Sequence, residues 1–124
     1  GDWKKAIDIY IHQLPDTLDN RLELAEAQTG AGRASEALKT LQHISSSDAR
    51  VDLARARAEY HLDHFEKIKA VSRSAAIKAR KAGSDQMQAM ALYFQGVAEY
   101  QLGSPTGALP HFIEAQELFR SVSD

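Results

Sequence analysis

No cysteine occurs in the sequence, so disulfide bonds and metal sites built from thiolates are excluded. No apolar run approaches the roughly 20 residues that a membrane-spanning helix needs. The formal net charge is -2 at pH 7, so the chain carries no general basic field that would attract nucleic acid or anionic lipid. We therefore expect no nucleic-acid partner and no membrane partner.

The start of the chain also lacks a signal-peptide pattern. Together with the missing cysteines, this favours a cytoplasmic location. Hydrophobic residues make up 44% and charged residues 26% of the 124 residues, which are ordinary values for a globular protein. The length predicts a single domain over residues 1–124.

Motifs for catalysis are missing as well. There is no Gly-x-Ser-x-Gly elbow and no glycine-rich phosphate loop. No two histidines have the His-x-x-x-His spacing of a helical metal site, and His61 and His64 stand on either side of an expected turn. We interpret the histidines as solvated side chains, and we expect no enzyme, no metal and no cofactor.

Three clusters of like charge admit a chemical interpretation. Two are pairs of carboxylates that could act as general acid and base. One is a basic series that could bind phosphate, although it lacks interleaved aromatic residues. Charged side chains on helices are most often exposed, so we interpret all three as solvated faces. The clusters are Glu23 with Glu26, Asp48 with Asp52, and Arg73 with Lys78, Arg80 and Lys81.

One pattern recurs four times along the chain. A turn residue is followed, five places later, by a small or aliphatic residue, and the turn residues are spaced 31, 31 and 40 apart. Periodic apolar residues between these turns are typical of amphipathic helices. The pairs of turn residue and small or aliphatic residue are Gly1 with Ala6, Gly32 with Ala37, Asp63 with Ile68, and Gly103 with Ala108.

These signals predict about seven antiparallel helices, arranged as a partial repeat over residues 1–14 and helical hairpins over 17–45, 48–82 and 85–122. We interpret Gly30, Gly32 and Gly103 as turn glycines with positive φ. Asp48 is expected to cap a helix. The helices expected before the last hairpin are Asp2–Gln13, Asn20–Ala31, Ser35–Ile44, a helix after Asp48 that ends near Leu62, and a long one from His64 to Ala82.

Two prolines mark the final helix. Pro105 suits its first turn, with Ser104 as the N-cap. Pro110 has no N–H to donate to the carbonyl of Thr106, so we expect a kink there or a late start of the helix.

Small residues also recur in the first helix of each hairpin. Two helices can cross closely only where the side chains between them are small. This pattern resembles the tetratricopeptide repeat (TPR) family, whose repeats place small residues at one position of each helix. The matching positions are Ala25, Ala56 and Gly96 in the first helices, and Ala6, Ala37, Ile68 and Ala108 in the second helices.

The resemblance implies an α-α superhelix that is a fragment of a longer array. It also implies a scaffold for protein–protein interaction within a larger regulatory or signalling protein. The sequence departs from the family pattern at two kinds of position. Arg55 stands where a leucine is usual, and the family's tryptophan position holds Arg21, Asp52 and Leu92.

In the family, the first helices line a concave groove that binds peptides. The resemblance carries this role to Leu22, Glu26, Thr29, Leu53, Arg57, Tyr60, Tyr93, Val97 and Tyr100, with Arg50 and Met90 at the rim. The basic and amide pattern that clamps a chaperone's terminal carboxylate is absent, because Leu22 and Glu26 occupy the relevant positions. Tyr and Arg dominate binding hot spots. The residues that we expect to bind a peptide are therefore Arg57, Tyr60, Tyr93, Val97 and Tyr100.

Three alternatives stay open. Tyr60 and Tyr100 could pack between repeats. The chain could self-associate through exposed end helices, near Trp3 and Tyr10 at one end and near Phe112 and Phe119 at the other. It could also be a sensor domain that binds a peptide or small ligand and controls an attached effector.

Overall fold

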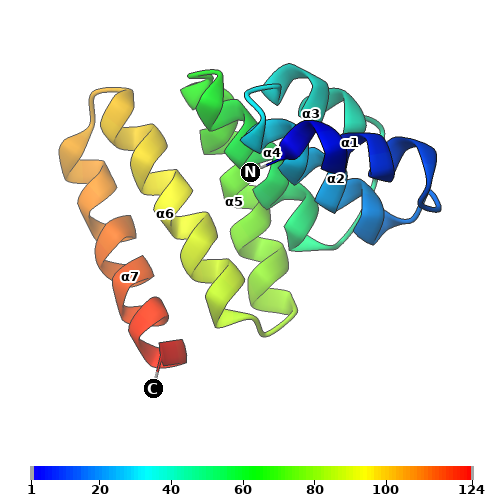
Figure 1. Ribbon diagram of the computed structural model, residues 1–124. Helices are drawn as coiled ribbons and strands as arrows, with labels where there is room; N and C mark the ends of the chain where they lie inside the picture. Colours follow the sequence, from blue (N-terminus) through cyan, green and yellow to red (C-terminus); the bar gives the residue numbers. More distant parts are fainter. Residues whose placement is uncertain (1, 124) are drawn as a thin grey trace.

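The computed structural model describes residues 2–123, which form an all-α fold of seven helices joined by short turns (Figure 1). This confirms the expected fold class and number of helices. The helices are α1 (Trp3–His12), α2 (Leu18–Gly30), α3 (Ala34–Thr40), α4 (Ala49–His61), α5 (Phe65–Lys81), α6 (Asp85–Gln101) and α7 (Pro105–Ser123).

The helices stack in two layers. Each helix packs against the next one along the chain, and α2 also packs on α4, as α4 does on α6. Within residues 2–123, α3, α5 and α7 do not approach one another closely. The layer of α2, α4 and α6 is therefore the tighter one, as on the inner side of a curved helical repeat. Figure 1 shows α5, α6 and α7 as antiparallel neighbours, with α1 to α3 on the other side of α4.

The turns between paired helices lie at the expected residues. Gly32, Asp63 and Gly103 all have positive φ, at 80°, 58° and 92°. Asp is one of the few residues other than glycine that tolerates this conformation. The expectation for Gly30 was wrong, because it ends α2 without a positive φ. A Cβ there would lie 2.8 Å from Cζ2 of Trp3, so Gly30 provides room for the indole ring.

The helix expected over Ser35–Ile44 ends early, at Thr40. Arg55 on α4 accounts for the conformation that follows. Its Nη2 donates hydrogen bonds to the carbonyl oxygens of Leu41 at 2.8 Å and Ile44 at 3.1 Å. These carbonyls bind a guanidinium, and the helix does not continue past them.

The last helix begins at Pro105 and continues through Pro110, so a late start was wrong. The missing N–H of Pro110 removes a hydrogen bond to the carbonyl of Thr106. Both residues are exposed, so solvent can reach that carbonyl in place of the lost donor. An exposed face therefore tolerates a proline that a buried face would not.

Alanine dominates the interior. Within residues 2–123, fifteen of the 22 buried apolar residues are alanines, which allows the helix axes to lie close together. Ala37 and Ala108 are 0% and 1% exposed, so both are buried as expected. Gly96 is the extreme case, because a Cβ there would lie 2.7 Å from Cε1 of Phe112.

A polar contact recurs where paired helices meet. Gln28, Glu59 and Glu99 stand at equivalent positions, each six residues before the first residue of its hairpin's second helix. Gln28 accepts a hydrogen bond from Thr40. Glu59 and Glu99 instead contact His64 at 2.5 Å and His111 at 3.0 Å. These two histidines thus contact carboxylates. His64 is exposed as expected, whereas His111 is half-buried, so the expectation of a solvated side chain was wrong for His111.

Asp52 is buried, with 3% of its surface exposed. Its carboxylate accepts a hydrogen bond from Ser74 at 2.9 Å and lies 2.8 Å from Nζ of Lys78 and 3.6 Å from Nη1 of Arg55. The expectation of solvated faces was therefore wrong for Asp52 and for Lys78. The carboxylate joins α4 to α5 through a buried ion pair.

We expect Ala108→Leu to lower the free energy of unfolding by about 1–3 kcal/mol, because α7 crosses α6 too closely to admit a larger side chain. Urea denaturation measures this change. Ala70→Leu is the matched control, since Ala70 is exposed on α5 and should tolerate leucine. Equal stability of the two variants would contradict the close crossing.

Asp52→Asn keeps the shape of the side chain and removes its charge. We expect a loss of about 1.5–3 kcal/mol, because Lys78 then lacks its buried partner. The double variant with Lys78→Met should lose less than the sum of the single variants. Additive losses in urea denaturation would mean that the two charges do not interact.

Candidate functional site

The inner layer is hollowed between α2, α4 and α6. The hollow has a volume of about 420 Å³. We call it the groove hollow, and it includes most positions that the sequence assigned to the groove in these helices. Its lining includes Leu22, Glu26 and Thr29 on α2, Leu53 and Arg57 on α4, and Met87 and Met90 on α6.

A second, smaller hollow adjoins it. We call it the apolar hollow; its volume is about 290 Å³ and it is lined by Arg57, Met90, Tyr93, Phe94 and Phe119. Arg57 and Met90 line both hollows, so the two form one continuous surface. Phe119, which the self-association alternative places near an exposed end helix, therefore contributes to the inner surface from α7.

The residues expected to bind a peptide divide into two groups. Arg57 and Tyr93 share the apolar hollow, and the Tyr93 ring is held by Phe112, with ring centroids 5.8 Å apart. Tyr60 and Tyr100 line neither hollow and are 45% and 57% exposed. About half of each of these two side chains is thus available to solvent. Val97 is half-buried and lines neither hollow.

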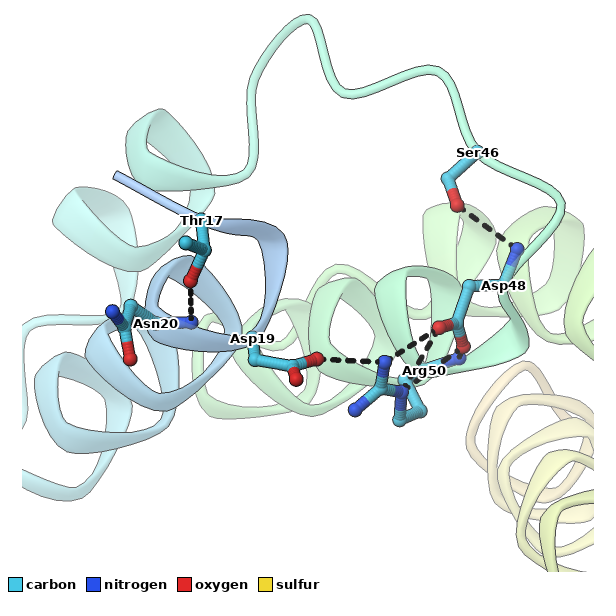
Figure 2. Close-up of polar contacts among 6 residues, drawn as sticks. All are labelled: Thr17, Asp19, Asn20, Ser46, Asp48 and Arg50. Carbon is cyan, nitrogen blue, oxygen red and sulfur yellow. Dashed lines mark hydrogen bonds and ion pairs between the residues drawn. The ribbon is translucent and has the colours of Figure 1, made fainter. Parts of the chain in front are cut away.

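Arg50 occupies the rim where α2 and α4 begin. Its Nη2 lies 2.9 Å from Oδ1 of Asp19 and 2.7 Å from Oδ2 of Asp48, so it joins the two helix ends (Figure 2). Hydrogen bonds from the Arg50 side chain lower the pKa of Asp48, and those to Asp48 and then Asp19 raise the pKa of Arg50. Two carboxylates thus neutralise the cation at the rim.

Capping side chains fix the same helix ends. Thr17 accepts a hydrogen bond from the backbone N–H of Asn20 at 3.1 Å, and Asp48 accepts one from the N–H of Arg50 at 2.9 Å. Ser46 in turn accepts from the N–H of Asp48 at 3.0 Å (Figure 2). Each cap satisfies a backbone donor that a helix leaves without a partner. Asp48 is therefore the N-cap that the sequence predicted, and it also binds the rim arginine.

Arg57 differs from the other half-buried arginines. Arg21 binds Asp16 at 2.7 Å, and Arg55 lies 3.6 Å from Asp52. No carboxylate of the described chain lies within 4.0 Å of the Arg57 guanidinium. The inner surface thus holds one cation that no carboxylate neutralises, between the groove hollow and the apolar hollow.

The α2 side of the surface is acidic. Glu23 accepts a hydrogen bond from the Tyr10 hydroxyl, which raises the pKa of that tyrosine. Glu26 is exposed and lines the groove hollow one turn further along α2. Charge therefore changes along the surface, from acidic at α2 to basic at α4 and apolar at α6. Such a gradient can fix the direction of a bound chain.

A larger hollow, of about 590 Å³, lies between α1, α2 and α3. It is lined by Leu14, Arg21 and Lys39, among others, beside the early end of α3. Its arginine is already bound to Asp16, and it contains none of the residues expected to bind a peptide. We therefore regard the inner surface as the candidate site.

Comparisons with family models, curated proteins and solved structures gave no match. Within residues 2–123, no helix combines the length and apolar composition of a membrane span. Nor does this part of the chain group three or more His, Asp or Glu side chains in a way that could hold a metal ion.

The Asp48–Arg50 pair predicts a response to acid. Because the folded pKa of Asp48 lies below its ordinary value of 3.8, the pair stabilises the fold above that pH and loses its effect as pH falls through the folded pKa. Asp48→Asn keeps a capping side chain but lacks this charge. The difference in unfolding free energy between the two proteins, about 0.5–1 kcal/mol at pH 6, should shrink as the pH falls below 3.8. A difference that stays constant in urea denaturation across this range would contradict the pairing.

Proposed function

We propose that the chain is a TPR-like module of a larger cytoplasmic regulatory or signalling protein, and that its inner surface binds an extended peptide segment of a partner protein. The observation that carries this proposal is the continuous surface of the groove hollow and the apolar hollow. It combines an exposed tyrosine, methionine side chains and an arginine that has no carboxylate partner among residues 2–123.

Rigidity supports peptide binding at this surface. Its side chains stand on helices that are packed and capped, so little of the site must be ordered when a ligand binds. Tyr93 is packed against Phe112, and Met90 can adapt its shape to different apolar side chains. The surface thus offers both a fixed anchor and an adaptable one.

The TPR-like part of the proposal is supported by the close helix crossings. The positions that the resemblance requires to be small are buried at Ala25, Ala56, Ala37 and Ala108. Gly96, at the same position in the third hairpin, leaves no room for a Cβ beside Phe112.

Self-association is the second candidate function. The outer face of α7 exposes Leu109 and Ile113, which are 58% and 47% exposed and lie one helical turn apart. Such adjacent apolar side chains can mark an interaction site. This face is separate from the inner surface, so variants can distinguish the two functions.

A displayed library of random peptides, about twelve residues long, tests the proposal. Peptides selected on the wild-type protein should bind the Tyr93→Ala variant and the Met90→Ala variant at least about tenfold more weakly, because each substitution removes an anchor. Leu109→Ala is the matched control on the outer face and should bind normally. Selected peptides that bind the two groove variants normally, but are lost with Leu109→Ala and Ile113→Ala, would move the interaction site to α7.

A further inference from the structure

The guanidinium of Arg57, which has no carboxylate partner in the described chain, constrains the chemistry of the ligand. A guanidinium that loses contact with water is unfavourable unless a carboxylate or other acceptor binds it. The two other half-buried arginines each have a carboxylate partner, at Asp16 and at Asp52. A ligand that covers Arg57 must therefore supply the acceptor that the described chain does not.

The surroundings of Arg57 define what lies beside that acceptor. On one side is the apolar hollow, where Met90, Tyr93 and Phe119 can enclose a large apolar side chain. On the other side is the groove hollow, with Glu26 on α2. Arg50 cannot serve as a second anion site, because Asp19 and Asp48 already bind it.

We infer that the bound segment carries an Asp or Glu side chain that pairs with Arg57, next to a leucine, methionine or aromatic side chain that fills the apolar hollow. This inference rests on the proposed function and specifies its ligand. The acid belongs to the interior of the segment rather than to a chain end, because the surface continues on both sides of Arg57. A guanidinium can bind such a carboxylate through two parallel hydrogen bonds.

The distance between packed helices determines how far apart the acid and the apolar side chain lie along the bound segment. Packed helices lie about 8–10 Å apart, and an extended chain rises about 3.3 Å per residue. An acid above Arg57 on α4 and an apolar side chain against Tyr93 on α6 are therefore separated by about two or three residues along the segment.

General attraction of acidic peptides does not explain such a preference. The chain has a formal charge of -2, and Glu26 would repel an acid placed over α2. The inner surface thus favours one acid at one position and disfavours a run of acids. A positively charged side chain suits the α2 side.

The selected peptides test this inference directly. They are displayed as N-terminal fusions, so no free terminal carboxylate is present. We expect most to contain an Asp or Glu about two or three residues from a large apolar residue. In a synthetic copy of the strongest peptide, replacing that acid by its amide should weaken binding about tenfold or more, measured by fluorescence anisotropy.

The matching change in the protein identifies the partner of the acid. On Arg57→Gln, the acid and amide forms of the peptide should bind within about twofold of each other, whereas Arg73→Gln, on the outer helix α5, should keep the full preference. Arg57→Glu should prefer a peptide with lysine in place of the acid. Circular dichroism checks that each variant is folded, and the peptide substitution alone tests for the acid without any protein variant.

The possible results distinguish failure of this inference alone from failure of both proposals. Peptides that need Tyr93 and Met90, but contain no preferred acid or are insensitive to Arg57→Gln, overturn this inference and leave groove binding in place. Peptides that bind equally well without Tyr93 and Met90 overturn both. If the library yields no binder at all, both proposals are wrong for this inner surface.

Discussion

Close crossing of helices at alanine and glycine is the constraint on which this structure depends. Where α6 and α7 meet, Gly96 lies under the ring of Phe112 and Ala108 is buried, so the two helices can pack along their lengths. Other buried alanines, among them Ala25 on α2 and Ala56 on α4, likewise let α2, α4 and α6 pack as one layer. Because these three helices are fixed side by side, their outward-facing residues form a single hollowed surface rather than separate ridges. The geometry of the site is thus a consequence of the small size of the residues between the helices.

Two positions at which the sequence departs from the pattern of the family that it resembles contact each other in the fold. Asp52 stands where the resemblance would place a tryptophan, and Arg55 where it would place a leucine. In the fold they lie 3.6 Å apart, with Lys78 completing the charge balance. Arg55 also binds the carbonyl oxygens after the early end of α3. Replacing all partners of such an ion pair by apolar residues of similar size often leaves the stability about the same, whereas removing one partner destabilises the fold.

Sequence patterns predicted the turns and the buried small residues, because both depend on repetition over short stretches of the chain. Gly32, Asp63 and Gly103 fall at turns because the chain needs positive φ there, and Ala37 and Ala108 are buried because the spacing places them at crossings. What the patterns could not predict depends on contacts between distant residues. The burial of Asp52 requires Ser74 and Lys78, more than 20 residues away. Phe119 joins the inner surface from the C-terminal part of α7, where it lines the apolar hollow together with Arg57 on α4.

The distribution of satisfied charges explains why Arg57 matters for specificity. Within residues 2–123, every fully buried side-chain nitrogen or oxygen has a hydrogen-bond partner. Arg57 is only half-buried, so in the free protein water can still solvate its guanidinium. A peptide that covers the inner surface removes this water, and its own acceptor then decides whether the loss is compensated. A segment without an acid would leave a buried cation unpaired, while one with an acid gains a charge-assisted pair. The arginine therefore distinguishes among segments that fit the apolar hollow equally well, because rejecting an unsuitable ligand requires a group whose burial is unfavourable unless it is paired.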